Sequence, residues 1–164
     1  MTTGIGIEIK VKEFEEAGDD YNAILLKSLA DRLAEAFAER LHQLVRTKYW
    51  AFSRDEDLSY EELIKEKYQG IRPAPGYPAC PDHTLKNDIF ELLQVKKQIG
   101  IYLTESLAMY PAASVSGFFF SHPESKYFGL GQITEDQVED YCKRKNISLE
   151  EGEKALFPSL SYKN

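Results

Sequence analysis

The 164-residue sequence contains only two cysteines, Cys80 and Cys142, and they lie far apart in the chain. Small secreted domains that depend on disulfides carry many cysteines at short spacings, so this class is excluded. No apolar run approaches the roughly 20 residues that a membrane-spanning helix needs. The first residues also lack the charged-then-apolar pattern of a secretory signal. We therefore expect a cytoplasmic protein with no membrane partner.

An excess of basic residues is also missing. The chain has 20 Lys and Arg against 27 Asp and Glu, for a net charge of −7. Proteins that bind nucleic acids usually carry a basic stripe, so nucleic acid is not an expected partner. Two local basic clusters, at Lys96-Lys97 and at residues 143–145, are typical of solvated helix faces.

Several motifs of catalytic and nucleotide-binding proteins are absent. The sequence has no Gly-x-Ser-x-Gly motif and no Walker loop, and Gly129-Leu-Gly131 lacks the third glycine of a dinucleotide-binding fingerprint. Cys80-Pro-Asp-His83 is weak evidence for a metal site, because structural zinc needs a second pair of ligands. We expect neither a metal site nor a catalytic nucleophile in this chain.

Proline is concentrated in one segment, residues 72–83 (RPAPGYPACPDH), which we call the proline loop. It holds four of the seven prolines. Each proline fixes its own φ and pushes the preceding residue toward an extended conformation, so the loop is stiff. Two interpretations remain open from composition alone. The loop is either a polyproline II segment that connects two elements or docks on a partner, or a ligand-binding loop.

The other residues of the proline loop suit a small zwitterionic ligand. Arg72 offers a planar fork that pairs with a carboxylate. Gly76 has no side chain to hold a ligand away from the backbone. Tyr77 adds an aromatic face with a polar tip. S-adenosylmethionine carries the carboxylate, the ammonium and the flat ring that such a loop could bind.

Hydrophobic periodicity predicts one α+β domain, residues 1–164, with an N-terminal strand or extended arm over residues 1–18. From residue 21 to about 49, apolar side chains at three- and four-residue spacing predict one long amphipathic helix, with Asp19 or Asp20 as its N-cap. The apolar side chains of this pattern are Leu25, Leu29, Leu33, Phe37, Leu41 and Leu44.

Shorter elements follow along the chain. Capping boxes at Ser59, Thr134 and Ser148 predict helix starts, and residues 84–93 predict a helix with Leu85, Ile89, Leu92 and Leu93 inward. Residues 115–121 and 126–133 are rich in aromatic and β-branched residues around turn residues, so we predict that they form a hairpin.

The motif Arg72-Pro-Ala-Pro-Gly-Tyr77 resembles the Arg-x-x-x-Gly-Tyr signature of the activation domain of cobalamin-dependent methionine synthase. The resemblance extends over residues 19–39, 68–83, 103–127 and 136–145. It implies a curved antiparallel sheet flanked by helices. It also favours the ligand-binding interpretation of the proline loop.

The resemblance implies an S-adenosylmethionine site. Arg72 would hold the ligand's carboxylate, and Tyr127 would form a wall of the site. Further contacts would come from the carbonyls around Ala74, from the backbone of Gly76, Tyr77 and Phe128, and from the carboxylate of Glu35. In the family an N-terminal region, which residues 1–164 do not include, supplies an aspartate to the ligand's amino group. We expect its absence to cost about 1.5–3 kcal/mol of binding free energy.

The implied function is reductive methylation of cob(II)alamin. A partner domain or subunit of methionine synthase would hold the cobalamin, and a flavodoxin-type protein would donate the electron. Asp31 matches a family position that meets the cobalamin domain and receives the histidine displaced from cobalt. We expect this methyltransferase reactivation module to show no turnover as an isolated chain.

Two alternatives remain from sequence. The chain could be a non-catalytic S-adenosylmethionine sensor or interaction module that acts with a separate cobalamin protein. It could also be a remnant whose site has lost its ligand. A neighbouring gene for a cobalamin-binding protein would favour the reactivation function, whereas a neighbouring regulator would favour the sensor.

Overall fold

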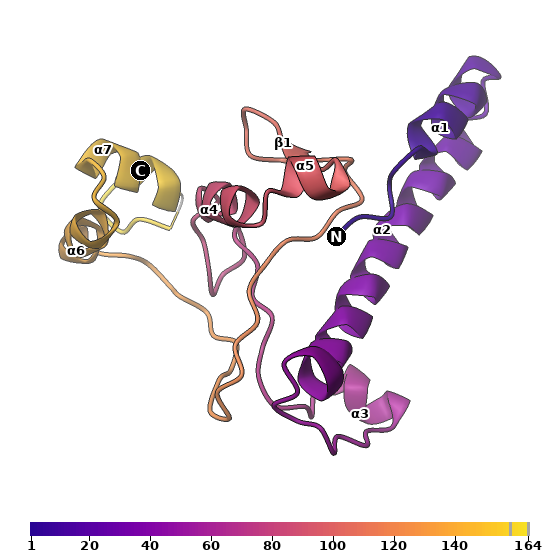
Figure 1. Ribbon diagram of the computed structural model, residues 1–164. Helices are drawn as coiled ribbons and strands as arrows, with labels where there is room; N and C mark the ends of the chain where they lie inside the picture. Colours follow the sequence, from indigo (N-terminus) through magenta and orange to yellow (C-terminus); the bar gives the residue numbers. More distant parts are fainter. Residues whose placement is uncertain (158, 164) are drawn as a thin grey trace.

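The computed structural model describes residues 1–157 and 159–163, and it confirms the predicted α+β class (Figure 1). The helices and strands, in chain order, are α1 (Ile7–Glu16), α2 (Asp20–Leu44), the π-helix η1 (Val45–Tyr49), α3 (Tyr60–Ile64), α4 (Leu85–Leu92), α5 (Val95–Ile99), β1 (Tyr102–Leu103), β2 (Met109–Tyr110), α6 (Glu135–Lys145) and α7 (Leu149–Leu156). None of the helices in the described residues is long and apolar enough to cross a membrane.

The N-terminal segment differs from the prediction. Residues 1–18 are not a strand or extended arm, because α1 occupies most of them. Alternation of isoleucines suggested a strand, but Ile7, Val11 and Phe14 also recur at helical spacing. This face packs on α2, where Val11 is buried. Only the first residues are extended, and Thr2 forms an isolated bridge with Ser114.

The long helix α2 begins where the sequence predicts. The carboxylate of Asp19 accepts a hydrogen bond from the backbone N–H of Asn22 (3.0 Å), which satisfies one of the free donors of the first turn. The helix ends in η1, where the N–H of Trp50 donates to the carbonyl of Val45. α1 and α2 lie side by side along one edge of the molecule (Figure 1).

The buried face of α2 is not the leucine face that the amphipathic pattern predicts. Its fully buried side chains are small ones and a histidine: Ala23, Ala30, Ala34, Ala38 and His42. Ala34 is 2% exposed, whereas Leu29 is 54% exposed. Small side chains let the N-terminal segment approach closely, and the hydroxyl of Thr3 donates to the carbonyl of Ala30 (2.6 Å). The predicted helix is present, but the prediction that its leucine face is the buried one is wrong for the described residues.

The sheet is small. β1 and β2 form an antiparallel pair in which Tyr102 faces Tyr110 and Leu103 faces Met109. Residues 115–121 and 126–133 do not form the predicted hairpin. Residues 117–120 run along residues 71–73 instead, and the N–H of Val115 donates to the carbonyl of Met1 (3.0 Å). The N–H of Phe118 donates to the carbonyl of Pro73 (2.9 Å).

Glycine makes the approach of these two segments possible. Ile71 and Phe120 form an antiparallel bridge, just beside Gly70. A Cβ on Gly70 would lie 2.2 Å from the carbonyl oxygen of Phe120, which no side chain tolerates. Gly117 plays the same part, since its Cβ would lie 2.7 Å from the carbonyl oxygen of Pro73.

The C-terminal helices α6 and α7 form a separate unit with its own small core. The predicted capping boxes at Thr134 and Ser148 begin the two helices, as the one at Ser59 begins α3. Gly152 lets the pair pack closely, because its Cβ would lie 2.1 Å from the sulfur of Cys142. The buried core of this unit consists of Ile133, Val138, Cys142, Leu156 and Leu160.

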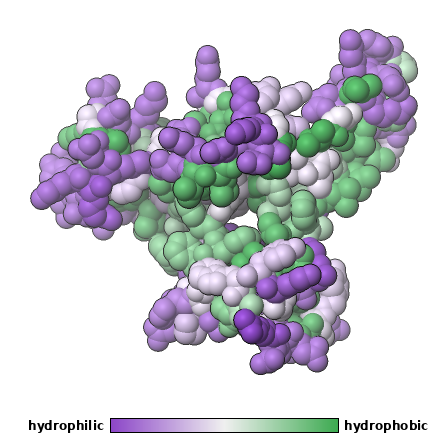
Figure 2. Space-filling view, in the orientation of Figure 1, coloured by the Kyte–Doolittle hydropathy of each residue, from purple (hydrophilic) through white to green (hydrophobic). Residues whose placement is uncertain are grey.

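Hydrophobic surface gathers in the middle of the molecule. In the view of Figure 2, hydrophobic residues cover the centre, between more hydrophilic ends. The predicted inward residues Leu92, at the end of α4, and Leu93, just after it, are exposed, whereas Lys86 on α4 is buried. The central region of the molecule therefore combines apolar surface with a buried amine, and a cavity of about 870 Å³ lies there.

Candidate functional site

A cavity of about 870 Å³ lies between α2, the proline loop and residues 114–119. Its volume falls within the range of small-molecule sites. Six of the residues predicted from sequence line this one cavity: Glu35, Arg72, Ala74, Tyr77, Tyr127 and Phe128. They come from three separated parts of the chain. We call this space the Arg72 cavity.

Two other residues singled out from sequence lie outside the wall of the cavity. Gly76 has a φ of +101°, and a Cβ there would lie 2.1 Å from the imidazole ring of His83, so only glycine fits. Its N–H donates to the carbonyl of Cys80 (2.7 Å), which closes the turn of the proline loop. Asp31 is exposed on α2 and is not among the lining residues.

Two side chains hold the guanidinium of Arg72. Nη1 donates to the hydroxyl of Tyr68 (2.6 Å), and Nη2 lies 2.6 Å from Oε2 of Glu39. Burial lowers the pKa of Arg72, but Tyr68 and Glu39 outweigh it and the pKa is raised. These contacts use at most two of five N–H donors. The side chain is 24% exposed and lines the cavity, so donors remain for an anionic group.

Tyr127 joins the two sides of the cavity. Its hydroxyl accepts a hydrogen bond from the backbone N–H of Arg72 (2.9 Å), 55 residues earlier in the chain. Tyr127 therefore lines the cavity and links it to the start of the proline loop. Neither the partner nor the geometry of this hydrogen bond is predictable from the sequence pattern.

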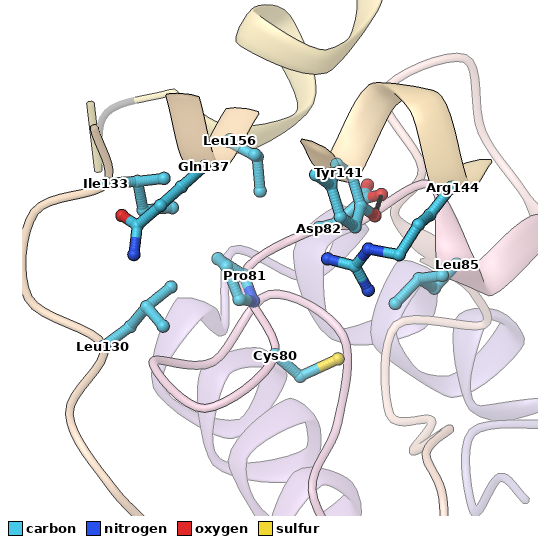
Figure 3. Close-up of a pocket in the computed structure, with 10 residues that line it drawn as sticks. All are labelled: Cys80, Pro81, Asp82, Leu85, Leu130, Ile133, Gln137, Tyr141, Arg144 and Leu156. Atoms are coloured by element: carbon cyan, nitrogen blue, oxygen red, sulfur yellow. Dashed lines mark hydrogen bonds between the residues drawn. The ribbon is translucent and has the colours of Figure 1, made fainter. Parts of the chain in front are cut away.

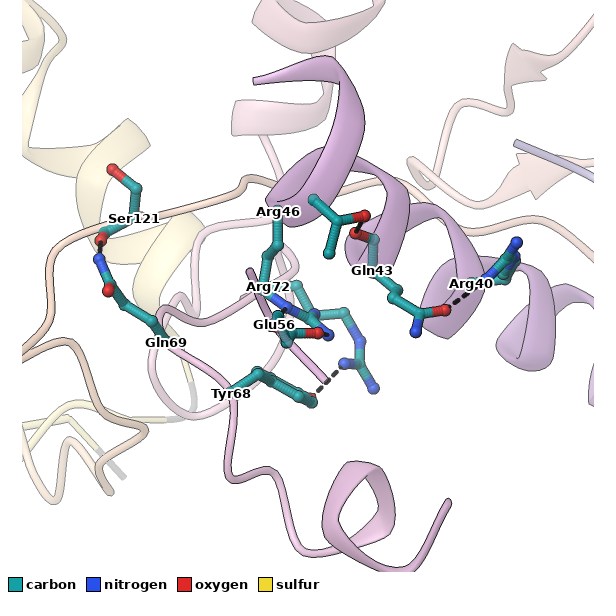
Figure 4. Close-up of polar contacts among 9 residues, drawn as sticks. Arg40, Gln43, Arg46, Glu56, Tyr68, Gln69, Arg72 and Ser121 are labelled. Atoms are coloured by element: carbon teal, nitrogen blue, oxygen red, sulfur yellow. Dashed lines mark hydrogen bonds and ion pairs between the residues drawn. The ribbon is translucent and has the colours of Figure 1, made fainter. Parts of the chain in front are cut away.

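Behind Arg72 lies a buried polar and aromatic cluster (Figure 4). Arg46 donates through Nε and Nη2 to both carboxylate oxygens of Glu56 (2.6 and 2.7 Å), and its guanidinium carbon lies 3.9 Å from the ring centroid of Tyr68. His42 stacks on Phe119 and meets Tyr68 edge-on. The two arginines thus contact the same tyrosine.

His42 is uncharged in this cluster. Burial, followed by the positive charges of Arg46 and Arg72, lowers the pKa of His42 to about 3. Neither ring nitrogen has a hydrogen-bond partner among the described residues. The histidine therefore acts here as a flat aromatic group between Phe119 and Tyr68.

Sequence reasoning did not identify Lys86 as a residue of the site. It is buried on α4, lines the cavity, and donates through Nζ to the carbonyl of Leu107. Burial lowers the pKa of Lys86. A signal was present in the sequence, because Lys86 lies three residues before Ile89 and therefore on the apolar side of the helix.

A second cavity, of about 330 Å³, lies where the proline loop meets α6 and α7 (Figure 3). One of its lining residues, the buried Asp82, accepts hydrogen bonds from Tyr141 and Lys145 of α6. Burial raises the pKa of Asp82, but Lys145, Tyr141 and Thr84 outweigh it and the pKa is lowered. None of the predicted ligand contacts lines this cavity, and Asp82 serves to anchor the end of the proline loop.

Comparison with known proteins identifies the family. The family model described as "Vitamin B12 dependent methionine synthase, activation domain" matches residues 1–146. A crystal structure of the MetH reactivation domain bound to AdoHcy (S-adenosylhomocysteine) is 60% identical and superposes with a TM-score of 0.91. The match covers 95% of this chain and 48% of that one, so this chain spans about half the length of that relative. The chain belongs to the activation domain family of vitamin B12-dependent methionine synthase.

Proposed function

We propose that the chain binds S-adenosylmethionine in the Arg72 cavity and presents its methyl group for the reductive methylation of cob(II)alamin. The observation that carries the proposal is the convergence of six predicted contact residues on one cavity of suitable size. The AdoHcy bound to the related reactivation domain supports it. A methyl group that leaves a sulfonium takes none of the sulfur's electrons with it, so S-adenosylmethionine becomes S-adenosylhomocysteine.

Each part of the ligand has a matching group in the cavity. The remaining donors of Arg72 would bind the carboxylate as a charge-assisted pair. The carbonyl of Ala74 would accept from the ligand's polar groups, and Tyr77 and Tyr127 offer aromatic faces to the adenine. Glu35 would place a negative charge near the cationic part of the ligand. The chain's contribution is to bind and orient the methyl donor.

Cobalamin would come from a partner domain or subunit. When bound there, it supplies a reduced cobalt centre that accepts the methyl group. Asp31 is exposed on the same helix as Glu35, one turn earlier, so a partner docked over this end of the cavity could reach it. We propose Asp31 as a contact with that partner.

We also propose that a flavodoxin-type electron donor docks through Lys96 and Lys97 on α5. The alternative cluster on α6 is largely engaged, because Lys145 pairs with Asp82 and Arg144 pairs with Asp140. Reversing the charge of Lys96 and Lys97 should weaken binding of the donor at low salt, whereas the same change at Lys143 should have little effect. Equal effects at the two clusters would contradict this assignment.

The experiment that tests the function is isothermal titration of the purified chain with S-adenosylmethionine, alone and after addition of a cobalamin-binding domain. Heat of binding with one site per chain supports the proposal. A silent titration in both conditions would show that residues 1–164 do not form this site, and would contradict it.

A further inference from the structure

Glu39 lies behind the Arg72 cavity rather than in its wall. It follows Glu35 by one turn of α2, but it is not among the residues that line the cavity. Its Oε2 lies 2.6 Å from Nη2 of Arg72. The contact joins residues 33 positions apart in the chain, so local helix geometry does not produce it.

The carboxylate of Glu39 is paired on one side only. Oε1 is buried and has no hydrogen-bond partner among the described residues. Glu56 differs, because both of its oxygens accept from Arg46. A buried carboxylate oxygen without a partner is unfavourable for folding. The side chain of Glu39 as a whole is 36% exposed, against 6% for Glu56, so Glu39 holds one guanidinium nitrogen at a more open position.

Tyr68 completes this arrangement from the other side. Its hydroxyl accepts from Nη1 of Arg72, while the ring is fixed by the guanidinium of Arg46 and the imidazole of His42. A flexible arginine side chain loses rotamer freedom when it binds a ligand. Tyr68 and Glu39 fix the guanidinium before any ligand arrives.

We propose that Glu39 is a positioning residue for ligand binding, which holds the fork of Arg72 in the orientation that meets the ligand's carboxylate. This inference rests on the proposed S-adenosylmethionine site. The ligand and Glu39 use different donors of Arg72, since the existing contacts occupy at most two of five. Glu39 therefore supports the ligand's carboxylate rather than competing with it.

The test compares two ligands on the intact chain by isothermal titration. S-adenosylhomocysteine carries the amino-acid carboxylate, and 5′-methylthioadenosine is a related adenosyl thioether without the amino-acid group. We expect Glu39→Gln to weaken S-adenosylhomocysteine by about tenfold, less than for the loss of a direct charge-assisted contact, because Glu39 acts through Arg72. We expect it to leave 5′-methylthioadenosine unchanged. The control is Glu91→Gln, which removes the same charge from the exposed side of α4 and should change neither affinity.

A double variant separates positioning from a general effect on the fold. If Glu39 acts only through Arg72, then Glu39→Gln combined with Arg72→Ala should bind no more weakly than Arg72→Ala alone. Equal weakening of both ligands by Glu39→Gln would overturn the inference, because it would indicate a damaged cavity. Tighter binding of S-adenosylhomocysteine would overturn it as well, because it would indicate competition for Arg72.

Binding of the two ligands to the wild-type chain separates failure of the proposed site from failure of the role of Glu39. If the wild-type chain binds S-adenosylhomocysteine and Glu39→Gln binds it equally well, the site stands and the role of Glu39 is wrong. If the wild-type chain binds neither ligand, the proposed function itself fails, and the role of Glu39 fails with it.

Discussion

Two arginines contact the same tyrosine, and their surroundings differ. Arg46 is fully buried, pairs with both oxygens of Glu56 and lies over the ring of Tyr68. Arg72 meets the hydroxyl of Tyr68 and one oxygen of Glu39, and 24% of its side chain is exposed at the cavity. Nη1 of Arg46 also has no partner among the described residues, but Arg46 is shut off from the cavity, whereas Arg72 lines it and can offer its remaining donors to a ligand.

This difference shows how one cluster serves both fold and function. The inner half, with Arg46, Glu56 and His42, is shielded from water and fixes the ring of Tyr68. The outer half consists of Arg72, Glu39 and the hydroxyl of Tyr68, and there the fixed tyrosine helps to hold Arg72 at the cavity. Changes in the inner half should therefore lower stability, and changes in the outer half should lower affinity.

The largest expected effect is on the inner half. Arg46→Ala leaves the buried carboxylate of Glu56 without its partner, and breaking a buried pair in this way costs about 3–5 kcal/mol of unfolding free energy. Urea unfolding followed by circular dichroism would measure the loss. A change below about 1 kcal/mol would show that Arg46 is not the structural member of the pair of arginines.

The second prediction uses the pH dependence of stability. The pKa of His42 is about 3 in the folded chain, below its ordinary value of 6.5, so the unfolded state takes up the proton first as the pH falls. The contribution of the neutral His42 to the free energy of unfolding is therefore present above pH 6.5 and is lost as the pH falls toward 3. It decreases by about 2 kcal/mol between pH 7 and 5.

Urea midpoints at pH 7, 6 and 5 would test the role of His42. His42→Phe keeps an aromatic ring against Phe119 but removes the titrating group, so the decline should be smaller in this variant. The same pH dependence in both proteins would show that His42 is not buried in its neutral form.

The third prediction concerns Tyr68, whose ring belongs to the inner half of the cluster and whose hydroxyl belongs to the outer half. Tyr68→Phe keeps the ring under Arg46 and removes the hydroxyl that accepts from Arg72. We expect a stability loss of about 1 kcal/mol, together with weaker binding of S-adenosylhomocysteine. Loss of several kcal/mol of stability with unchanged binding would reverse the assignment of the two halves.

Local signals in the sequence predicted much of the fold. The N-cap at Asp19 and the capping boxes at Ser59, Thr134 and Ser148 all involve residues within three positions of one another, and all four form. The proline loop indicated Arg72 and Tyr77 by composition, and the family resemblance added Glu35 and Tyr127. All four of these side chains line one cavity.

Contacts between distant residues were not predictable in the same way. The bridge from Ile71 to Phe120 replaced the expected hairpin, because an aromatic and β-branched segment does not specify which partner it pairs with. The inward face of α2 was misassigned because close approach of the N-terminal segment selects alanine there, as at Ala30. The contact of Glu39 with Arg72 also depends on the tertiary fold.

Ligand affinity and stability, measured for Arg72→Ala beside the wild-type chain, would show whether Arg72 binds the ligand. By titration with S-adenosylhomocysteine, we expect an affinity about 10- to 100-fold weaker, because the carboxylate loses a charge-assisted contact. By urea unfolding, we expect a stability loss of about 1–2 kcal/mol, because Tyr68 and Glu39 lose their contact with Arg72, which is smaller than the loss in Arg46→Ala. Unchanged affinity in Arg72→Ala would show that Arg72 is not the arginine that binds the ligand's carboxylate.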